Sequence, residues 1–235
     1  MLILDIEGKE VKIPQSYEEM TVTKFSGIWK ILTSHTFAKE GEELTEEQVL
    51  MEIEKDSEIT RKIIGYLLDI DDPDNIDYQQ AQEILVVFNN LMDNSSLLEK
   101  DYGDEKGFYH EGEWYEFPRK LLNENVTFGE YAEHKQIEQI FGKDMSNKYD
   151  YIPKQMAIWC RKAGEDKDSY DKMERENLFR TVTMDKVMMF TFFLTKRMNT
   201  LLPHFQTFME KKGIDFTGRS LTSSQDMVGS TQSMM

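Results

Sequence analysis

Cysteine, histidine and the motifs of common catalytic sites are scarce in this 235-residue chain. The single cysteine, Cys160, excludes an intramolecular disulfide and a cysteine-based zinc site. None of the four histidines (His35, His110, His134 and His204) falls in a His-Glu-x-x-His frame or pairs with another at helical ligand spacing. A glycine-rich phosphate loop and a nucleophile elbow are also missing. We therefore expect no catalytic residues, no metal and no cofactor, and predict that the protein is not an enzyme.

Basic charge and long hydrophobic runs are scarce as well. Lysine and arginine number 28 against 44 acidic residues, which gives a formal net charge of −16. Such a field repels phosphate backbones, so we expect no nucleic-acid partner held by general electrostatics. The longest apolar stretch, 187–194, is too short to cross a bilayer, and the first residues lack the basic region of a signal peptide. These features predict a cytosolic protein without a membrane partner.

What the chain does contain is a pattern that occurs twice. Residues 7–25 and 111–131 share the same order: a Glu-Gly turn, a proline, and a threonine that opens a helix. Apolar residues alternate with charged or polar ones around each Glu-Gly turn, which predicts a short β-hairpin. Thr127 and Glu130 form a capping box, whereas Lys24 replaces the acid after Thr21, so the first box is half present.

Helical spacing of apolar residues follows each predicted hairpin. We expect helices over residues 22–32, 45–53, 59–68, 77–92, 128–141, 152–161 and 186–202. Thr45 with Gln48 makes a capping box, and Asp77 is a helix N-cap. The last helix of each half corresponds to the other at an offset of 106 residues, from Asp77 to Thr183.

These patterns together predict a mainly α-helical (α+β) fold of two tandem units, each a short β-hairpin followed by a helical bundle. The units would span residues 1–104 and 105–214. Chance similarity of two hairpin–helix modules is the alternative to a true duplication. Residues 215–235 are polar and rich in methionine, serine and threonine, without a periodic apolar face, and predict a flexible tail.

Three groups of side chains could suggest chemistry, but each has a simpler structural interpretation. His134 and Glu138 are spaced to meet on one helix face, which favours a solvated helix pair over a metal site. The acidic run 69–77 lacks the glycine and terminal glutamate of a calcium loop and predicts a helix end, a proline turn and an N-cap. Cys160 has no adjacent histidine to act as a base, so we expect it to pack as a small hydrophobic residue.

Aromatic and methionine side chains gather in the second unit, in the hairpin and in the last helix. The predicted partner-binding residues are Tyr109, Trp114, Tyr115, Phe117, Met188, Met189, Phe192 and Phe193. Alternate residues of a strand face opposite sides, so some of the hairpin aromatics should be exposed. The segment 187–194 is apolar nearly all round, which predicts a helix buried on all sides, either within the fold or in an oligomer.

The opening sequence Glu-Gly-Lys-Glu-Val-Lys-Ile-Pro-Gln-Ser-Tyr-Glu-Glu-Met-Thr-Val-Thr-Lys-Phe (residues 7–25) resembles the start of bacteriophage tail assembly chaperone-like proteins. In that family a short hairpin, a proline and a helix entry precede an all-helical body. Similar openings occur in other small phage virion proteins. The resemblance implies a non-enzymatic role, either in helping tail proteins to polymerise around a tape measure or as part of a neck, tail or baseplate.

The expected function is therefore phage virion morphogenesis, in tail assembly, through protein–protein contacts in the host cell cytoplasm. Its partners would be other phage tail or virion proteins, and it could form a homo-oligomeric ring. A stable virion component of the neck, tail or baseplate ring is the first alternative. An acidic cytosolic protein that binds a basic host partner is an alternative of another class, and it predicts carboxylates concentrated on one face.

Overall fold

The computed structural model describes residues 1–6, 8–34, 44–92, 102, 105–117, 128–141, 144–165 and 170–196, and the predicted tail lies outside them. The chain is mainly helical with two small antiparallel sheets, which confirms the predicted fold class. The helices are α1 (Val22–Thr33), α2 (Glu46–Leu68), α3 (Tyr78–Met92), α5 (Phe128–Phe141), α6 (Ile152–Trp159), α7 (Lys172–Phe179) and a helix over residues 184–196. Two short 3-10 turns are η1 (Pro73–Asn75) and η2 (Met145–Asn147).

Both predicted hairpins are confirmed. β1 (Leu2–Ile6) pairs with β2 (Lys9–Ile13), and β3 (Gly107–His110) pairs with β4 (Glu113–Glu116). In the second hairpin the two turn residues both have positive φ, +49° at Glu111 and +80° at Gly112. A two-residue turn of this kind matches the twist of antiparallel strands, and glycine adopts it without steric cost.

α1 and α2 begin where the capping signals predict, whereas Thr127, the predicted cap of α5, lies outside the described residues. Thr21 caps α1 by accepting a hydrogen bond from the Lys24 amide, and no acid completes the box. Thr45 and Gln48 form the full capping box of α2. The predicted break between residues 53 and 59 is wrong, because α2 is one continuous helix of 23 residues. The intervening segment contains no glycine or proline, so nothing in it stops the helix.

The second half departs from the prediction after α6. That helix ends at Trp159 rather than continuing to Arg161, because the backbone at Cys160 is extended. The chain then forms a two-residue strand, β5 (Arg161–Lys162), which pairs with β4 and completes a sheet in the order β3-β4-β5. α7, capped by Asp171, was also not predicted. At the offset of 106 residues, the single helix α2 lies opposite α6, β5 and the start of α7.

Helix starts recur with the spacing seen in the sequence. α1 and α5 begin at residues 22 and 128, α2 and α6 at 46 and 152, and α3 and the last described helix at 78 and 184. Each pair is 106 residues apart. The order hairpin, helix, helix, final helix is therefore present in both halves. The boundary between residues 104 and 105, and the duplication itself, stay predictions.

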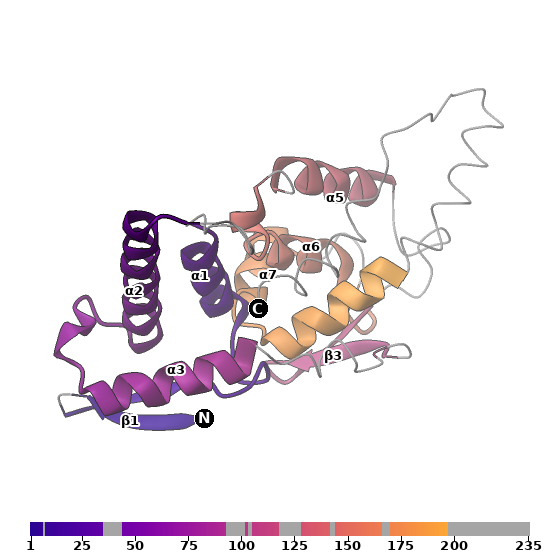
Figure 1. The fold of residues 1–235 in the computed structure, drawn as a ribbon. Helices are drawn as coiled ribbons and strands as arrows, with labels where there is room; N and C mark the ends of the chain where they lie inside the picture. The colour runs from indigo at the N-terminus through magenta and orange to yellow at the C-terminus, as the bar shows by residue number, and fades with distance from the viewer. Residues whose placement is uncertain are drawn as a thin grey trace.

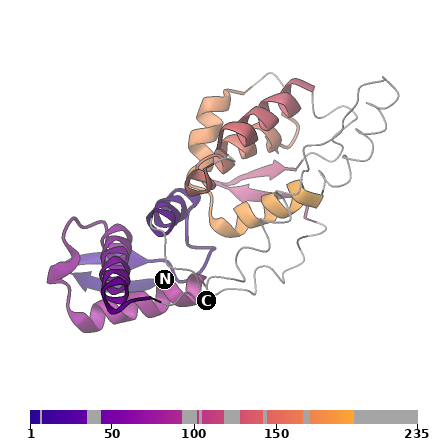
Figure 2. The same ribbon diagram turned by 45° about the horizontal axis from the view of Figure 1, so that its top comes forward.

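The first hairpin packs with α2 and α3, and the second lies with α6, α7 and the last helix (Figure 1). α1 lies between these two groups in both views (Figures 1 and 2). One side of α1 meets α2, where Tyr66 approaches Gly27 so closely that an added Cβ would lie 2.1 Å from its ring. The other side packs Phe25 and Trp29 edge-on against Tyr149, with ring centroids 4.7 and 5.4 Å apart.

Backbone groups join the starts of α1 and of the helix over residues 184–196. The Val22 amide donates to the Val182 carbonyl, and the Met184 amide donates to the Met20 carbonyl, each at 2.8 Å. Thr21 and Thr183 form an isolated antiparallel bridge between these bonds. The first amides of a helix have no partner within it. Here the first amide of each helix finds its acceptor in the residues that precede the other helix.

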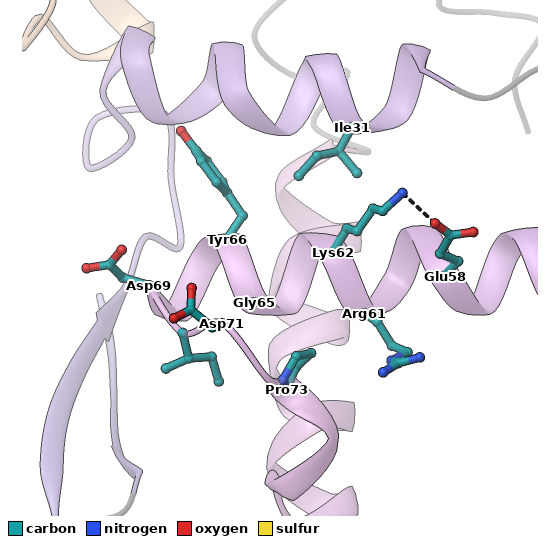
Figure 3. A pocket seen from close by; sticks show the side chains of 10 residues that line it. Ile31, Glu58, Arg61, Lys62, Gly65, Tyr66, Asp69, Asp71 and Pro73 are labelled. Carbon is teal, nitrogen blue, oxygen red and sulfur yellow. Dashed lines mark ion pairs between the residues drawn. The ribbon is translucent and has the colours of Figure 1, made fainter.

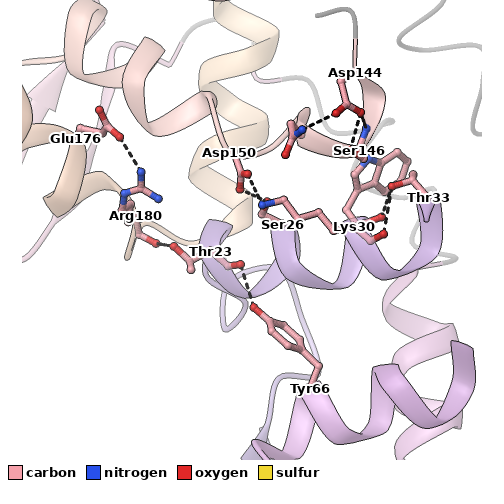
Figure 4. A network of polar contacts seen from close by, with 12 residues as sticks. Thr23, Ser26, Lys30, Thr33, Tyr66, Asp144, Ser146, Asp150, Glu176 and Arg180 are labelled. Atoms are coloured by element: carbon pink, nitrogen blue, oxygen red, sulfur yellow. Dashed lines mark hydrogen bonds and ion pairs between the residues drawn. The ribbon is translucent and has the colours of Figure 1, made fainter. Parts of the chain in front are cut away.

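A polar network reinforces this junction (Figure 4). The Ser26 hydroxyl donates to Asp150 Oδ1 at 2.5 Å, and Lys30 forms an ion pair with the same carboxylate. Burial raises the pKa of Asp150, but the hydrogen bonds from Lys30 and Ser26 outweigh it and leave the pKa below its usual value. Thr23 Oγ1 donates to the Arg180 carbonyl at 2.7 Å. α1 is thus tied to the second half along its length.

Replacing Asp150 by alanine tests whether the network stabilises the junction. The variant leaves the buried Ser26 hydroxyl without its acceptor, so we expect a loss of about 1–3 kcal/mol in the free energy of unfolding. Urea denaturation measures the change. Ser26→Ala and the Ser26→Ala/Asp150→Ala double variant complete a cycle, in which the double variant should lose less than the sum of the single ones. Strict additivity would show that the two side chains do not interact.

Gly107 provides a second test, of the strand pairing. A Cβ at this position would lie 2.0 Å from the Tyr115 carbonyl oxygen, which belongs to the paired backbone and has little room to move. Gly107→Ala should therefore lower the melting temperature more than Gly112→Ala. A Cβ at residue 112 would meet open space, so Gly112→Ala should lower the free energy of unfolding by about 1–2 kcal/mol through its positive φ alone. Equal melting temperatures of the Gly107→Ala and Gly112→Ala variants would contradict the close approach of the two strands at Gly107.

Candidate interaction surface

The two faces of the second hairpin differ sharply. Tyr109 and Trp114 are cross-strand partners with ring centroids 4.8 Å apart, and Tyr109 is 65% exposed. The next pair, Phe108 and Tyr115, is buried on the opposite face. This alternation follows from the strand geometry. Tyr109 and Trp114, called the aromatic pair below, are the outward-facing aromatics of this sheet.

Two of the predicted partner-binding residues belong to the core instead. Tyr115 packs edge-on against Phe179 of α7, with ring centroids 5.0 Å apart. Phe117 stacks on Phe193 of the last helix at 4.7 Å with nearly parallel planes. Both Tyr115 and Phe117 are at most 2% exposed. Their burial removes them from any partner surface and corrects the prediction for these two positions.

The last described helix, over residues 184–196, has a buried face and an open one. Val187, Phe190 and Leu194 are buried, whereas Phe192 is 40% exposed. Met188, Met189 and Phe193 are half-buried, and the last two pack against the core. Burial on all sides within the fold is therefore wrong for the part of this helix that the structure describes, and burial in an oligomer, the other alternative, stays a prediction. Phe192 joins the aromatic pair as an accessible candidate.

A buried histidine fixes the hairpin beside the aromatic pair. The Nε2 atom of His110 lies 3.1 Å from both the Leu178 carbonyl and the Thr181 hydroxyl oxygen. The Thr181 hydroxyl itself donates to Leu178, so both oxygens can accept from a protonated Nε2. This contact holds the end of β3 to the end of α7. His35 and His204 lie outside the described residues.

His134 and Glu138 meet on α5 as their spacing predicts, with Nε2 and Oε1 3.3 Å apart. The pair is only partly solvated, because His134 is fully buried whereas the Glu138 side chain is 36% exposed. Trp159 Nε1 donates to His134 Nδ1 at 3.1 Å, which places the proton of a neutral ring on Nε2, facing Glu138. This arrangement joins α5 to α6 and is a structural role for the histidine.

A charged group lies inside the second half around Arg175. Its guanidinium binds both carboxylate oxygens of Glu165, donates to the Cys160 carbonyl at 3.2 Å, and stacks on Tyr170 with 4.1 Å to the ring centroid. Burial raises the pKa of the Cys160 thiol well above its usual value, although Arg175 acts in the opposite direction. A thiol held protonated is a poor nucleophile, which agrees with packing as a small hydrophobic residue.

A groove of about 560 Å³ lies between α1 and α2 (Figure 3). Ile31 and Tyr66 form its apolar walls, and charged side chains of α2 surround them. Lys62 already pairs with Glu58 at 2.5 Å, and Arg61 with Asp74 at the same distance. The cations that line this groove are thus engaged within the protein, which gives it no evident charged ligand.

The acidic run after α2 forms the predicted helix end, proline turn and N-cap. Asp69 ends α2 in the left-handed conformation, with φ of +57°. Asp72 accepts from the Asp74 amide at the start of η1, and Asp77 accepts from the Gln79 amide in the first turn of α3. Among the described residues no three His, Cys, Asp or Glu side chains are grouped to hold a metal ion.

The His134–Glu138 contact leads to a test by pH. Burial raises the pKa of Glu138, but hydrogen bonds from His134 and Lys135 outweigh it and bring the pKa from 4.5 to about 2. The folded state therefore favours the ionised carboxylate, and this stabilisation is present above pH 4.5 and lost as the pH falls toward 2.

Glu138→Gln should accordingly lower the melting temperature at pH 7, and the difference from the parent protein should shrink through that pH window. Glu133→Gln is the matched control, because Glu133 is on the same helix and its ion pair with Lys172 is exposed. A difference between parent and Glu138→Gln that does not change with pH would contradict the assignment.

Comparison with protein families, curated proteins and solved structures finds no match for this chain. Within the described residues, no helix combines the length and the apolar character needed to cross a membrane. What the protein does must therefore be inferred from its own residues and their geometry.

Proposed function

We propose that this protein acts without catalysis in bacteriophage virion morphogenesis, as a tail assembly chaperone-like protein that binds other tail proteins. The resemblance of residues 7–25 to such proteins supports the phage assignment. The aromatic pair supports action through protein contacts, and it is the observation on which the proposal rests.

The aromatic pair has the properties of a binding hot spot. Tyrosine and tryptophan are enriched among the residues that contribute most to protein interfaces, and truncating such a residue costs about 2 kcal/mol or more of binding energy. Tyr109 presents most of its ring to solvent, against the cross-strand Trp114. When a partner covers an exposed ring of this size, a large apolar area leaves water, which favours binding.

The aromatic pair is also held rigidly, which favours binding. Phe108 and Tyr115 lie beneath it in the core, with ring centroids 5.7 Å apart. His110, which follows Tyr109 in β3, ties the strand to α7. A preorganised surface loses little conformational entropy when it binds, so more of the contact energy appears as affinity.

The hairpins add a second means of association. Within the described residues the first sheet contains only β1 and β2, so each strand has one edge without a paired strand. Such edges can pair with a strand of another chain. Repeated head-to-tail contacts of this kind would build the ring expected of a stable neck, tail or baseplate component, which is the alternative to a transient chaperone.

A phage that carries this gene provides the test. Without the gene we expect tail assembly to fail, and the Tyr109→Ser/Trp114→Ser double variant should complement the loss at least tenfold less well than the parent protein, measured as infectious particles. Tyr78→Ser is the matched control, because Tyr78 is 77% exposed but lies on α3, and it should complement fully.

Two further results decide between the outcomes. Normal tails in the absence of the gene would overturn the proposed function. Full complementation by the double variant would show that the aromatic pair is not needed for the proposed function. Mass spectrometry of purified particles separates a chaperone, which is absent from them, from a virion component, which is retained.

A further inference from the structure

The first half of α2 carries apolar side chains that the described structure does not cover. α2 is about 34 Å long. Its buried residues all lie in the second half, from Ile59 to Leu68. In the first half, Val49 is 43% exposed, Leu50 62% and Ile53 60%. Figure 1 shows this end of α2 standing away from α3 and β1.

These side chains continue the stripe that α2 buries further along. At about 100° per residue, Val49 lies in line with the buried Leu67, and Ile53 with the buried Ile64. Leu50 widens the exposed part to an arc of about 100°, the usual width of the apolar face of a packed helix. The stripe is thus of the core type, but its first half has no cover among the described residues.

Acidic side chains border this exposed stripe on both sides. Residues 46–58 contain six carboxylates and one lysine. Glu52 and Asp56 project on one side of the stripe and Glu47 and Glu54 on the other, as the helical spacing requires. No ion pair within the described residues engages Glu47, Glu54 or Asp56, and all three are exposed.

We propose that this surface, the α2 acidic–apolar face of Val49, Leu50 and Ile53 with its rim of Glu47, Glu54 and Asp56, is a docking site for a basic amphipathic helix of a partner protein. The partner would place apolar residues at i, i+3 and i+4 against the stripe, and lysine or arginine against the rim. This site is separate from the aromatic pair and does not depend on the role in tail assembly.

Charge complementarity selects this occupant. A second copy of the chain, placed with α2 against α2, would bring two sets of six carboxylates together, and like charges in contact oppose association. An apolar helix without basic residues would cover the stripe but would leave the acidic rim partly desolvated without partners. A basic helix satisfies both parts of the surface.

The experiment uses the whole protein and a fluorescein-labelled helical peptide of leucine and lysine, about 18 residues long so that it spans the stripe. Fluorescence anisotropy should show saturable binding that weakens when salt rises from about 50 mM to about 500 mM. A peptide with the same lysines, but with serine in place of leucine, should bind at least tenfold more weakly. Equal binding of the two peptides would overturn the proposal, because it would reflect general attraction to an acidic protein.

Variants locate the binding. Ile53→Ser and, separately, the double variant Glu47→Lys/Glu54→Lys should each raise the Kd of the leucine–lysine peptide about tenfold, which corresponds to about 1.4 kcal/mol of binding free energy. Ile140→Ser on α5 is the matched control, because Ile140 is also 60% exposed, and it should bind as the parent does. Circular dichroism checks that each variant is folded, and we expect all of them to fold because the substituted side chains are exposed.

Two outcomes would overturn the assignment. Unchanged binding by both α2 variants would place the peptide elsewhere on the protein. Concentration-dependent sedimentation of the protein alone, abolished by Ile53→Ser, would assign the face to a second copy of this chain. Neither result would bear on the tail-assembly test, which uses different residues and a different readout.

Discussion

The reciprocal backbone bonds between Val22 and Val182, and between Met184 and Met20, set the arrangement of the rest of the chain. A helix start exposes amides that need acceptors, and the sequence gives α1 only half a capping box. The first amide of α1, on Val22, finds its acceptor instead in a segment about 160 residues away, and the same segment receives an acceptor in return. Because both bonds are buried with their neighbours, neither helix start can move without leaving unpaired amides in both.

α1 therefore has two packed sides, and this decides which surfaces of the molecule remain open. Gly27 lets Tyr66 of α2 approach on one side, while Tyr149 covers Phe25 and Trp29 on the other. α2 is in contact with α1, but it is longer than the elements that cover it. Its first half is consequently left as accessible apolar surface.

Local signals predicted most of the fold, and contacts between distant residues account for what was missed. The glycines of the two hairpin turns, the Thr45 capping box and the Asp77 cap depend on a few neighbouring residues, and all are found in the structure. β5 depends on its pairing with β4, which its own two residues do not indicate. Strand alternation required one aromatic face of the second hairpin to be buried. Which face was buried depended on Phe179, in a helix that the sequence did not reveal.

Acidic residues have two separate physical roles in this chain. In the second half, Glu130 and Glu165 pair with Arg161 and Arg175 at largely buried positions, where an unpaired charge would be strongly unfavourable. On the first half of α2 the carboxylates instead surround apolar side chains and face solvent. There they would oppose a second copy of the chain placed with α2 against α2. In the proposed docking, the same charge would therefore both disfavour a second copy and select a basic partner.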